Sequence, residues 1–124
     1  MYNEFDKCIS LFSVEMEAPD YWHDVGVIHA SSLLEEFTGD DWSKILGAVV
    51  DKSDAWLVRL CEAIGGFPSD DALLVLLKVI GSNNREVFFA ALESIRSMVF
   101  VGTDVSKYLR EIELAVVSGK EIAD

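Results

Sequence analysis

Apolar residues recur at helical spacing in short stretches along the whole chain, and each stretch stops at a break rich in Gly, Pro, Asn or Asp. In the clearest stretch, Trp56, Leu60 and Ile64 share one side of a helix that ends at the GGFP break over 65–68. This spacing matches the 3.6-residue turn of an α-helix, and no hairpin-type turn joins alternating strands. The pattern therefore predicts an all-α fold.

Seven such stretches predict seven short helices, most of them preceded by a Ser or Asp that can cap a helix. The run 73–77 is so apolar that it must be covered on more than one side, and a buried strand is its alternative. We prefer a helix there because Leu dominates and a Ser-Asp-Asp cap precedes the run. The expected helices cover about 2–17, 20–37, 40–50, 54–64, 72–80, 85–98 and 104–118.

Two of these stretches repeat each other. Trp56 aligns with Val87, and Glu62 aligns with Glu93, each 31 positions later. Such an offset is typical of stacked helical pairs, which bury their apolar faces against neighbouring pairs. A compact irregular helical bundle is the alternative. We expect one domain over 1–124, with the first helix as an N-terminal cap and HEAT-like antiparallel pairs over about 21–50, 54–80 and 84–118.

The charge balance limits the class of partner. The chain has 22 Asp and Glu against 10 Lys and Arg, a formal net charge of -12. This charge repels nucleic-acid backbones and anionic membrane surfaces, and it attracts basic proteins. We therefore expect no direct nucleic-acid or membrane partner, although the acidity alone also keeps a small domain soluble. No signal-type N-terminus or membrane-spanning run is present in the sequence, so we expect a cytoplasmic protein.

The sequence contains no residue pattern that points to catalysis. It lacks the usual hydrolase, metalloprotease, phosphate-binding and dinucleotide-binding motifs. His23 and His29 are six residues apart, on opposite sides of a helix, and Cys8 and Cys61 have no zinc-type spacing. We expect no enzyme activity, no catalytic residue, no metal site and no cofactor.

Acidic residues cluster at the predicted helix starts, where a carboxylate accepts backbone N–H groups and complements the helix dipole. If the helices alternate up and down, the third, fifth and seventh begin at the same edge of the stack. That edge could then contact Lys and Arg of a basic partner, while helix capping alone is the alternative explanation. The candidate partner-binding residues at this edge are Asp40, Asp41, Asp70, Asp71 and Asp104.

A second candidate surface lies near the start of the second predicted helix. Asp20, Tyr21 and Asp24 surround Trp22 and combine acidic and aromatic groups, as interface hot spots often do. The preferred alternative is that Trp22 belongs to the core.

Three stretches, 56–62, 67–77 and the SNNREV turn at 82–87 with the 90–95 segment that follows, carry a family resemblance. Over about 40–118, this layout of helix pairs resembles HEAT-like repeats. It is similar in particular to the small acidic HEAT-like immunity proteins of bacterial polymorphic-toxin and contact-dependent growth inhibition systems.

The resemblance implies a cytoplasmic toxin inhibitor that binds a cognate toxin domain, often a basic nuclease, and occludes its active site or substrate groove. It assigns no contact residue, because such interfaces vary from pair to pair. The implied complex joins one monomer to one toxin domain, while the sequence leaves the oligomeric state open. The alternative is a HEAT-like adaptor or scaffold module that binds a protein without inhibiting it.

Overall fold

The computed structural model describes residues 1–13 and 19–123, and within them every regular element is helical. The all-α prediction is confirmed, and the strand alternative for 73–77 is wrong. The elements are α1 (Tyr2–Ser13), α2 (Pro19–Tyr21), the π-helix η1 (Trp22–Gly26), α3 (Val27–Leu34), α4 (Gly39–Ala48), the 3-10 turn η2 (Val49–Asp51), α5 (Asp54–Ile64), α6 (Asp70–Val79), α7 (Arg85–Phe100), the 3-10 turn η3 (Ser106–Tyr108) and α8 (Leu109–Ala123).

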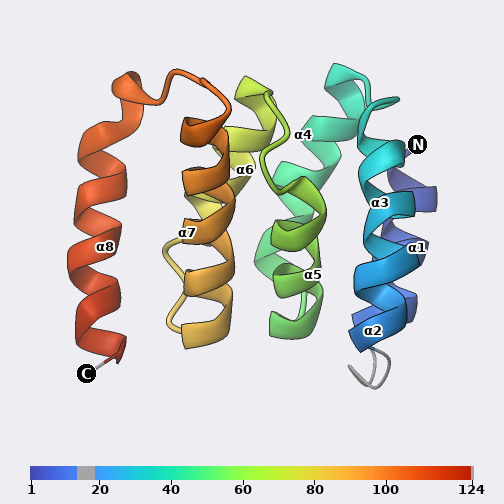
Figure 1. Cartoon of the computed structure of the whole chain (residues 1–124), viewed down its shortest axis with the longest axis horizontal. Helices are drawn as coiled ribbons and strands as arrows, with labels where there is room; N and C mark the ends of the chain where they lie inside the picture. Colours follow the sequence, from blue (N-terminus) through green and yellow to red (C-terminus); the bar gives the residue numbers. More distant parts are fainter. Residues whose placement is uncertain (14–18, 124) are drawn as a thin grey trace.

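The helices form two layers (Figure 1). Helices α3, α5 and α7 stand side by side in one layer, and α4 and α6 pack against each other in the layer behind. Successive helices run in opposite directions, which gives the antiparallel pairs α3–α4, α5–α6 and α7–α8. Helix α1 packs against α3, α4 and α5 at one end of the stack, and α8 packs against α7 at the other.

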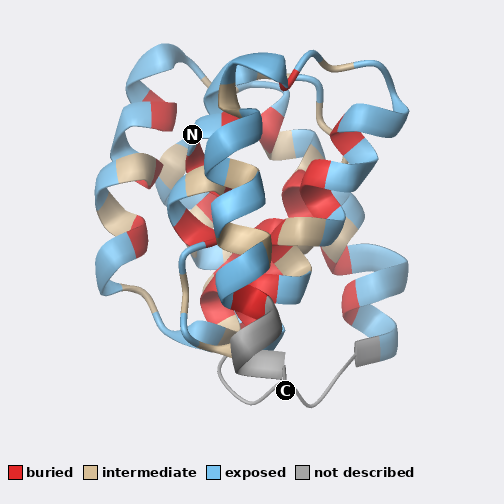
Figure 2. Ribbon diagram, turned by 90° about the vertical axis from the view of Figure 1, so that its left-hand side faces the viewer, coloured by how far each residue is buried: buried red, intermediate tan, exposed pale blue. Residues whose placement is uncertain are grey.

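The core lies between the two layers, and Figure 2 shows that the helices bury one side there and expose the other. Aromatic rings fill the N-terminal part of this core: Phe5 contacts Phe37 and Trp56 edge-on, and Phe37 contacts Trp42. Trp22 is fully buried, as expected for a core residue. No helix in the described part of the chain is long and apolar enough to cross a bilayer.

The helix starts follow local capping chemistry. The hydroxyls of Ser53 and Ser69 accept backbone N–H groups and cap α5 and α6, as the sequence predicted. The predicted start of α4 at Asp40 is wrong by one residue, because Thr38 is the N-cap. The Thr38 hydroxyl accepts the Asp41 N–H, and the Asp41 carboxylate accepts the Thr38 N–H, so the two residues form a capping box.

The predicted single helix over 20–37 is also wrong in detail. Helical structure ends at Leu34, and residues 22–26 form a π-helix between α2 and α3. Gly26 lies against aromatic rings here: a Cβ on it would lie 2.7 Å from Trp22 Cε3 and 2.8 Å from Phe12 Cε2. The predicted first helix reaches 17, and its last part, with Met16, lies outside the described residues.

Candidate partner-binding surface

Helices α4 and α6 and the segment leading into α8 all begin at one edge of the stack, the upper edge in Figure 1. This follows from the alternating helix directions. The edge therefore carries the first turns of α4 and α6, with Asp40, Asp41, Asp70 and Asp71, and the turn at Asp104 before η3. We call these helix starts the acidic edge.

Adjacent acidic residues on this edge have different environments. The Asp41 side chain is buried, and its carboxylate accepts the N–H groups of Tyr2 (3.1 Å) and Thr38 (2.9 Å). These bonds, the one from the Thr38 N–H above all, lower the pKa of Asp41 to about 2. Asp40 is exposed, and its Oδ2 lies 3.3 Å from Lys44 Nζ. Asp41 therefore serves the fold, whereas Asp40 is available to a partner.

The remaining carboxylates of the acidic edge are exposed. Asp70 and Asp71 occupy the first turn of α6, where Ser69 supplies the cap. The Asp104 carboxylate accepts the Ser106 N–H (2.9 Å), and hydrogen bonding to Ser106 lowers its pKa. All three carboxylates keep lone pairs free toward solvent.

The second predicted surface lies elsewhere. Asp20, Tyr21 and Asp24 are exposed, but they belong to α2 and η1 at the opposite, lower edge (Figure 1). The Tyr21 ring stacks on Phe12, with ring centroids 5.6 Å apart. The structure thus does not bring this group together with the acidic edge.

Sequence reasoning missed a row of three exposed apolar residues at the end of α7. Val99, Phe100 and Val101 expose 51%, 91% and 58% of their surface. They follow Met98, the last core residue of the helix, and the sequence interpretation treated them as a connection to the next helix. Three consecutive apolar residues outside the helical core pattern were the available signal. We call residues 99–101 the apolar tip.

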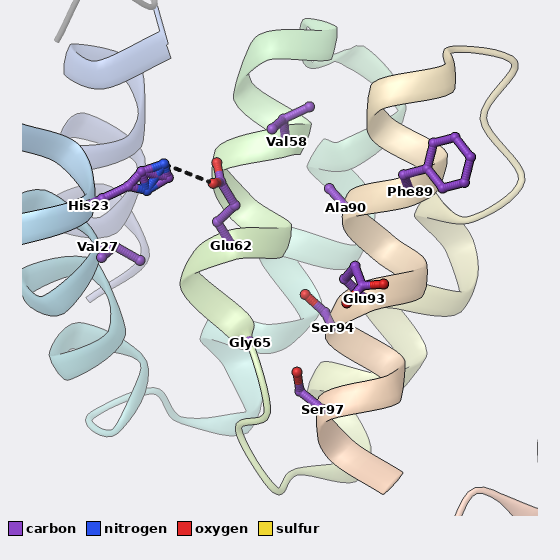
Figure 3. Close-up of a pocket in the computed structure, with 10 residues that line it drawn as sticks. All are labelled: His23, Val27, Val58, Glu62, Gly65, Phe89, Ala90, Glu93, Ser94 and Ser97. Carbon is purple, nitrogen blue, oxygen red and sulfur yellow. Dashed lines mark ion pairs between the residues drawn. The ribbon is translucent and has the colours of Figure 1, made fainter. Parts of the chain in front are cut away.

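A groove of about 480 Å³ crosses the layer formed by α3, α5 and α7 (Figure 3). Its apolar lining comes from all three helices and includes the Phe89 ring of α7, and the close-up shows Ser94 and Ser97 projecting from α7 toward it. At one end it is bounded by Gly65, where α5 stops, and by Ser97, two residues before Val99. Its lining residues are His23, Val27, Val58, Glu62, Gly65, Phe89, Ala90, Glu93, Ser94 and Ser97.

A buried arginine, Arg59, lies next to the groove and contacts its lining residue Glu62. Arg59 is 3% exposed; its guanidinium lies 5.0 Å from the centroid of the Trp22 ring, and its Nε donates to the Phe12 carbonyl. Its Nη1 donates to Glu62 Oε1 (3.2 Å), while Glu62 Oε2 lies 3.6 Å from His23 Nε2. This network fixes the Glu62 carboxylate in the wall of the groove.

The cysteine thiols and the candidate metal ligands of the described chain show no sign of a reactive site. Burial raises the pKa of the Cys61 thiol to about 12, so this thiol stays protonated and unreactive at neutral pH. Cys8 is half-buried, and burial raises its pKa as well. Within residues 1–13 and 19–123, no three His, Cys, Asp or Glu side chains form a group that could hold a metal ion.

No protein-family model, curated protein or solved structure matches this chain. The resemblance to immunity proteins is carried by residue patterns alone and stays a prediction.

Proposed function

We propose that this chain is a binding protein that recognises a basic protein and neutralises it by occlusion. The observation that carries the proposal is the acidic edge, where Asp40, Asp70, Asp71 and Asp104 are exposed side chains on one side of the helix stack. The resemblance of the helix pairs to HEAT-like immunity proteins suggests the kind of partner: a toxin domain, such as a nuclease, whose active site or substrate groove is basic.

The electrostatics favour this partner. A formal charge of -12 on a 124-residue chain attracts basic surfaces over a range of roughly 8 Å at physiological salt. A nuclease groove is lined with cations that bind phosphates, and carboxylates at helix starts present negative charge in fixed positions. The acidic edge would thus occupy the site that the nucleic acid otherwise fills, and fast association would protect the cell when a toxin arrives.

The first experiment is a pull-down with the tagged chain, followed by an assay of RNA or DNA cleavage by the retained protein, alone and in the complex. We expect a basic domain that is active alone and inactive at equimolar binding. A non-enzymatic partner would instead support the alternative function, a HEAT-like adaptor or scaffold.

The acidic edge is tested by reversing two of its charges. The double variant Asp70→Lys/Asp71→Lys should associate with the recovered basic domain roughly tenfold more slowly at low salt, with a flatter salt dependence. The matched control is Asp51→Lys/Glu86→Lys, which changes the net charge equally at two exposed positions outside both candidate surfaces, after α4 and in the first turn of α7. Stopped-flow association rates distinguish the two variants. Equal slowing in both would show that the overall net charge sets the association rate and that the acidic edge has no special role.

A further inference from the structure

The apolar tip is the one run of consecutive exposed large apolar residues in the described part of the chain. Single exposed apolar side chains are common, but three consecutive ones at a helix end are characteristic of a contact surface. Phe100, with 91% of its surface exposed, has the most accessible side chain among the exposed large apolar residues. Its burial by a partner would remove a large apolar area from water.

The backbone holds the apolar tip in a fixed conformation. The Thr103 N–H donates to the Met98 carbonyl (2.9 Å), and the Gly102 N–H donates to the Val99 carbonyl (3.0 Å). Gly102 has φ +97°, a left-handed conformation that suits glycine. This pair of bonds is a Schellman motif, which ends α7 cleanly. A partner would therefore meet an ordered backbone at the tip and lose little backbone conformational entropy in binding it.

Negative charge lies on the segments next to the apolar tip. Asp104 follows the tip within the same connection, and Asp71 lies in the first turn of α6, a helix that packs against α7. The loop before α6 is close to the end of α7, since a Cβ on Gly66 would lie 3.2 Å from the Ser97 carbonyl oxygen. The acidic edge and the apolar tip are thus parts of one surface, which continues into the groove at Ser97.

The charge identifies the class of occupant. A second copy of the chain would bring another net charge of -12 against the same edge, and the two copies would repel each other. A basic segment complements the edge, and apolar side chains in that segment would cover Phe100. Such a mixed contact, apolar at its centre and polar at its rim, is the usual anatomy of a protein–protein interface.

We propose that the apolar tip is the anchor of the partner interface, and that it takes an apolar segment flanked by Lys or Arg on the partner. Phe100 packs against the apolar side chains of this segment, while Asp71 and Asp104 pair with its flanking cations. The proposal rests on the proposed function, because it specifies how the basic partner is bound.

A phage library of random dodecapeptides, panned against the full chain, tests the surface with a defined probe. We expect enrichment of peptides that combine apolar residues with Lys or Arg. A synthetic copy of the dominant peptide should bind Phe100→Ser at least roughly tenfold more weakly than the unsubstituted chain. The matched control is Leu11→Ser, which removes another apolar side chain, 75% exposed, from the last turn of α1. Neither substitution changes the charge, and thermal melting checks that both variants fold.

Three results would overturn the proposal: no enrichment, enrichment of acidic or purely apolar peptides, or equal binding by Phe100→Ser and the unsubstituted chain. A dimer in sedimentation that Phe100→Ser dissociates would also overturn it, because the tip would then be a self-interface. Failure of the proposed function has a different outcome. If peptides bind through Phe100 but the pull-down partner is not inhibited, the proposed interface would stand and the proposed neutralising function would be wrong.

Discussion

The two ends of the helix stack are built differently. At the N-terminal end, α1 buries Phe5 and Ile9 completely and presents mainly polar residues outward. At the other end, α8 exposes Leu109, Leu114 and Val117. Helix α1 contacts three other helices across both layers, whereas α8 contacts α7 as its main helical neighbour.

This difference shows where the stability of the stack resides. In stacked helical pairs, each pair is stabilised by its neighbours, and an end helix with a polar outer face closes the core. Helix α1 meets this requirement and α8 does not. We therefore expect α8 to open locally before the rest of the stack unfolds, and the predictions below compare substitutions at the two ends.

The largest effect is expected from truncating a core aromatic at the closed end. Phe5→Ala removes a fully buried ring that contacts Phe37 and Trp56, and it should lower the free energy of unfolding by about 3–5 kcal/mol. Leu114→Ala at the open end should change it by less than about 0.5 kcal/mol, because this side chain is exposed. Urea unfolding measures both values, and similar losses would contradict the comparison.

A smaller difference is expected between two glycines that face aromatic rings. Gly26→Ala should cost about 1–3 kcal/mol, because the new Cβ meets the rings of Trp22 and Phe12 inside the closed end. Gly119→Ala in α8 places a Cβ against the Phe88 ring. This contact is closer than any at Gly26, but α8 has α7 as its main helical neighbour and can relieve the overlap by moving outward, so we expect less than half the cost. Thermal unfolding of both variants tests this order, and a greater loss from Gly119→Ala would show that α8 is held as firmly as α1.

The smallest difference concerns two carboxylates that accept backbone N–H groups. Asp41→Asn should lower the Tm by several degrees, because Asp41 joins α4 to Tyr2 of α1. Asp104→Asn, which loses a local bond to Ser106, should lower it less.

The pH dependence gives this prediction a sign. The folded pKa of Asp41, about 2, is below its ordinary value of 3.8, so its ionised form stabilises the fold above pH 4. That contribution disappears as the pH falls from about 4 to about 2, and the Tm gap between Asp41→Asn and the unsubstituted chain should close over this range. If the Tm difference persists at pH 2, the stabilisation by Asp41 would come from packing and not from its ionised form.

Much of the fold followed from local patterns. Helical periodicity identified each main helix, and Ser53 and Ser69 marked two starts correctly because capping depends on nearby residues. The 31-residue offset anticipated the stacked pairs. The π-helix at 22–26 was not predictable, because it accompanies the close packing of Gly26 on rings from two elements, a tertiary contact that no local pattern encodes.

The candidate surface was predictable in position but not in residue detail. Alternating helix directions placed the acidic starts at one edge, but the sequence treated Asp40 and Asp41 alike. Burial of Asp41 depends on the Tyr2 N–H, 39 residues away in the sequence. The groove likewise forms only where three helices pack together, so its lining residues could not be predicted from the sequence.

The alternating direction of the helices also makes the acidic edge modular. Each helical pair contributes one helix start to the same side of the molecule, as α4, α6 and α8 do. Duplicating the 31-residue unit that contains α5 and α6 would lengthen the contact side by roughly 8–10 Å, the usual spacing between packed helices. It would also add another pair of aspartates in the same register. Adding or removing helical pairs would thus change the length of the contact side in fixed increments, and each pair would contribute the same local chemistry.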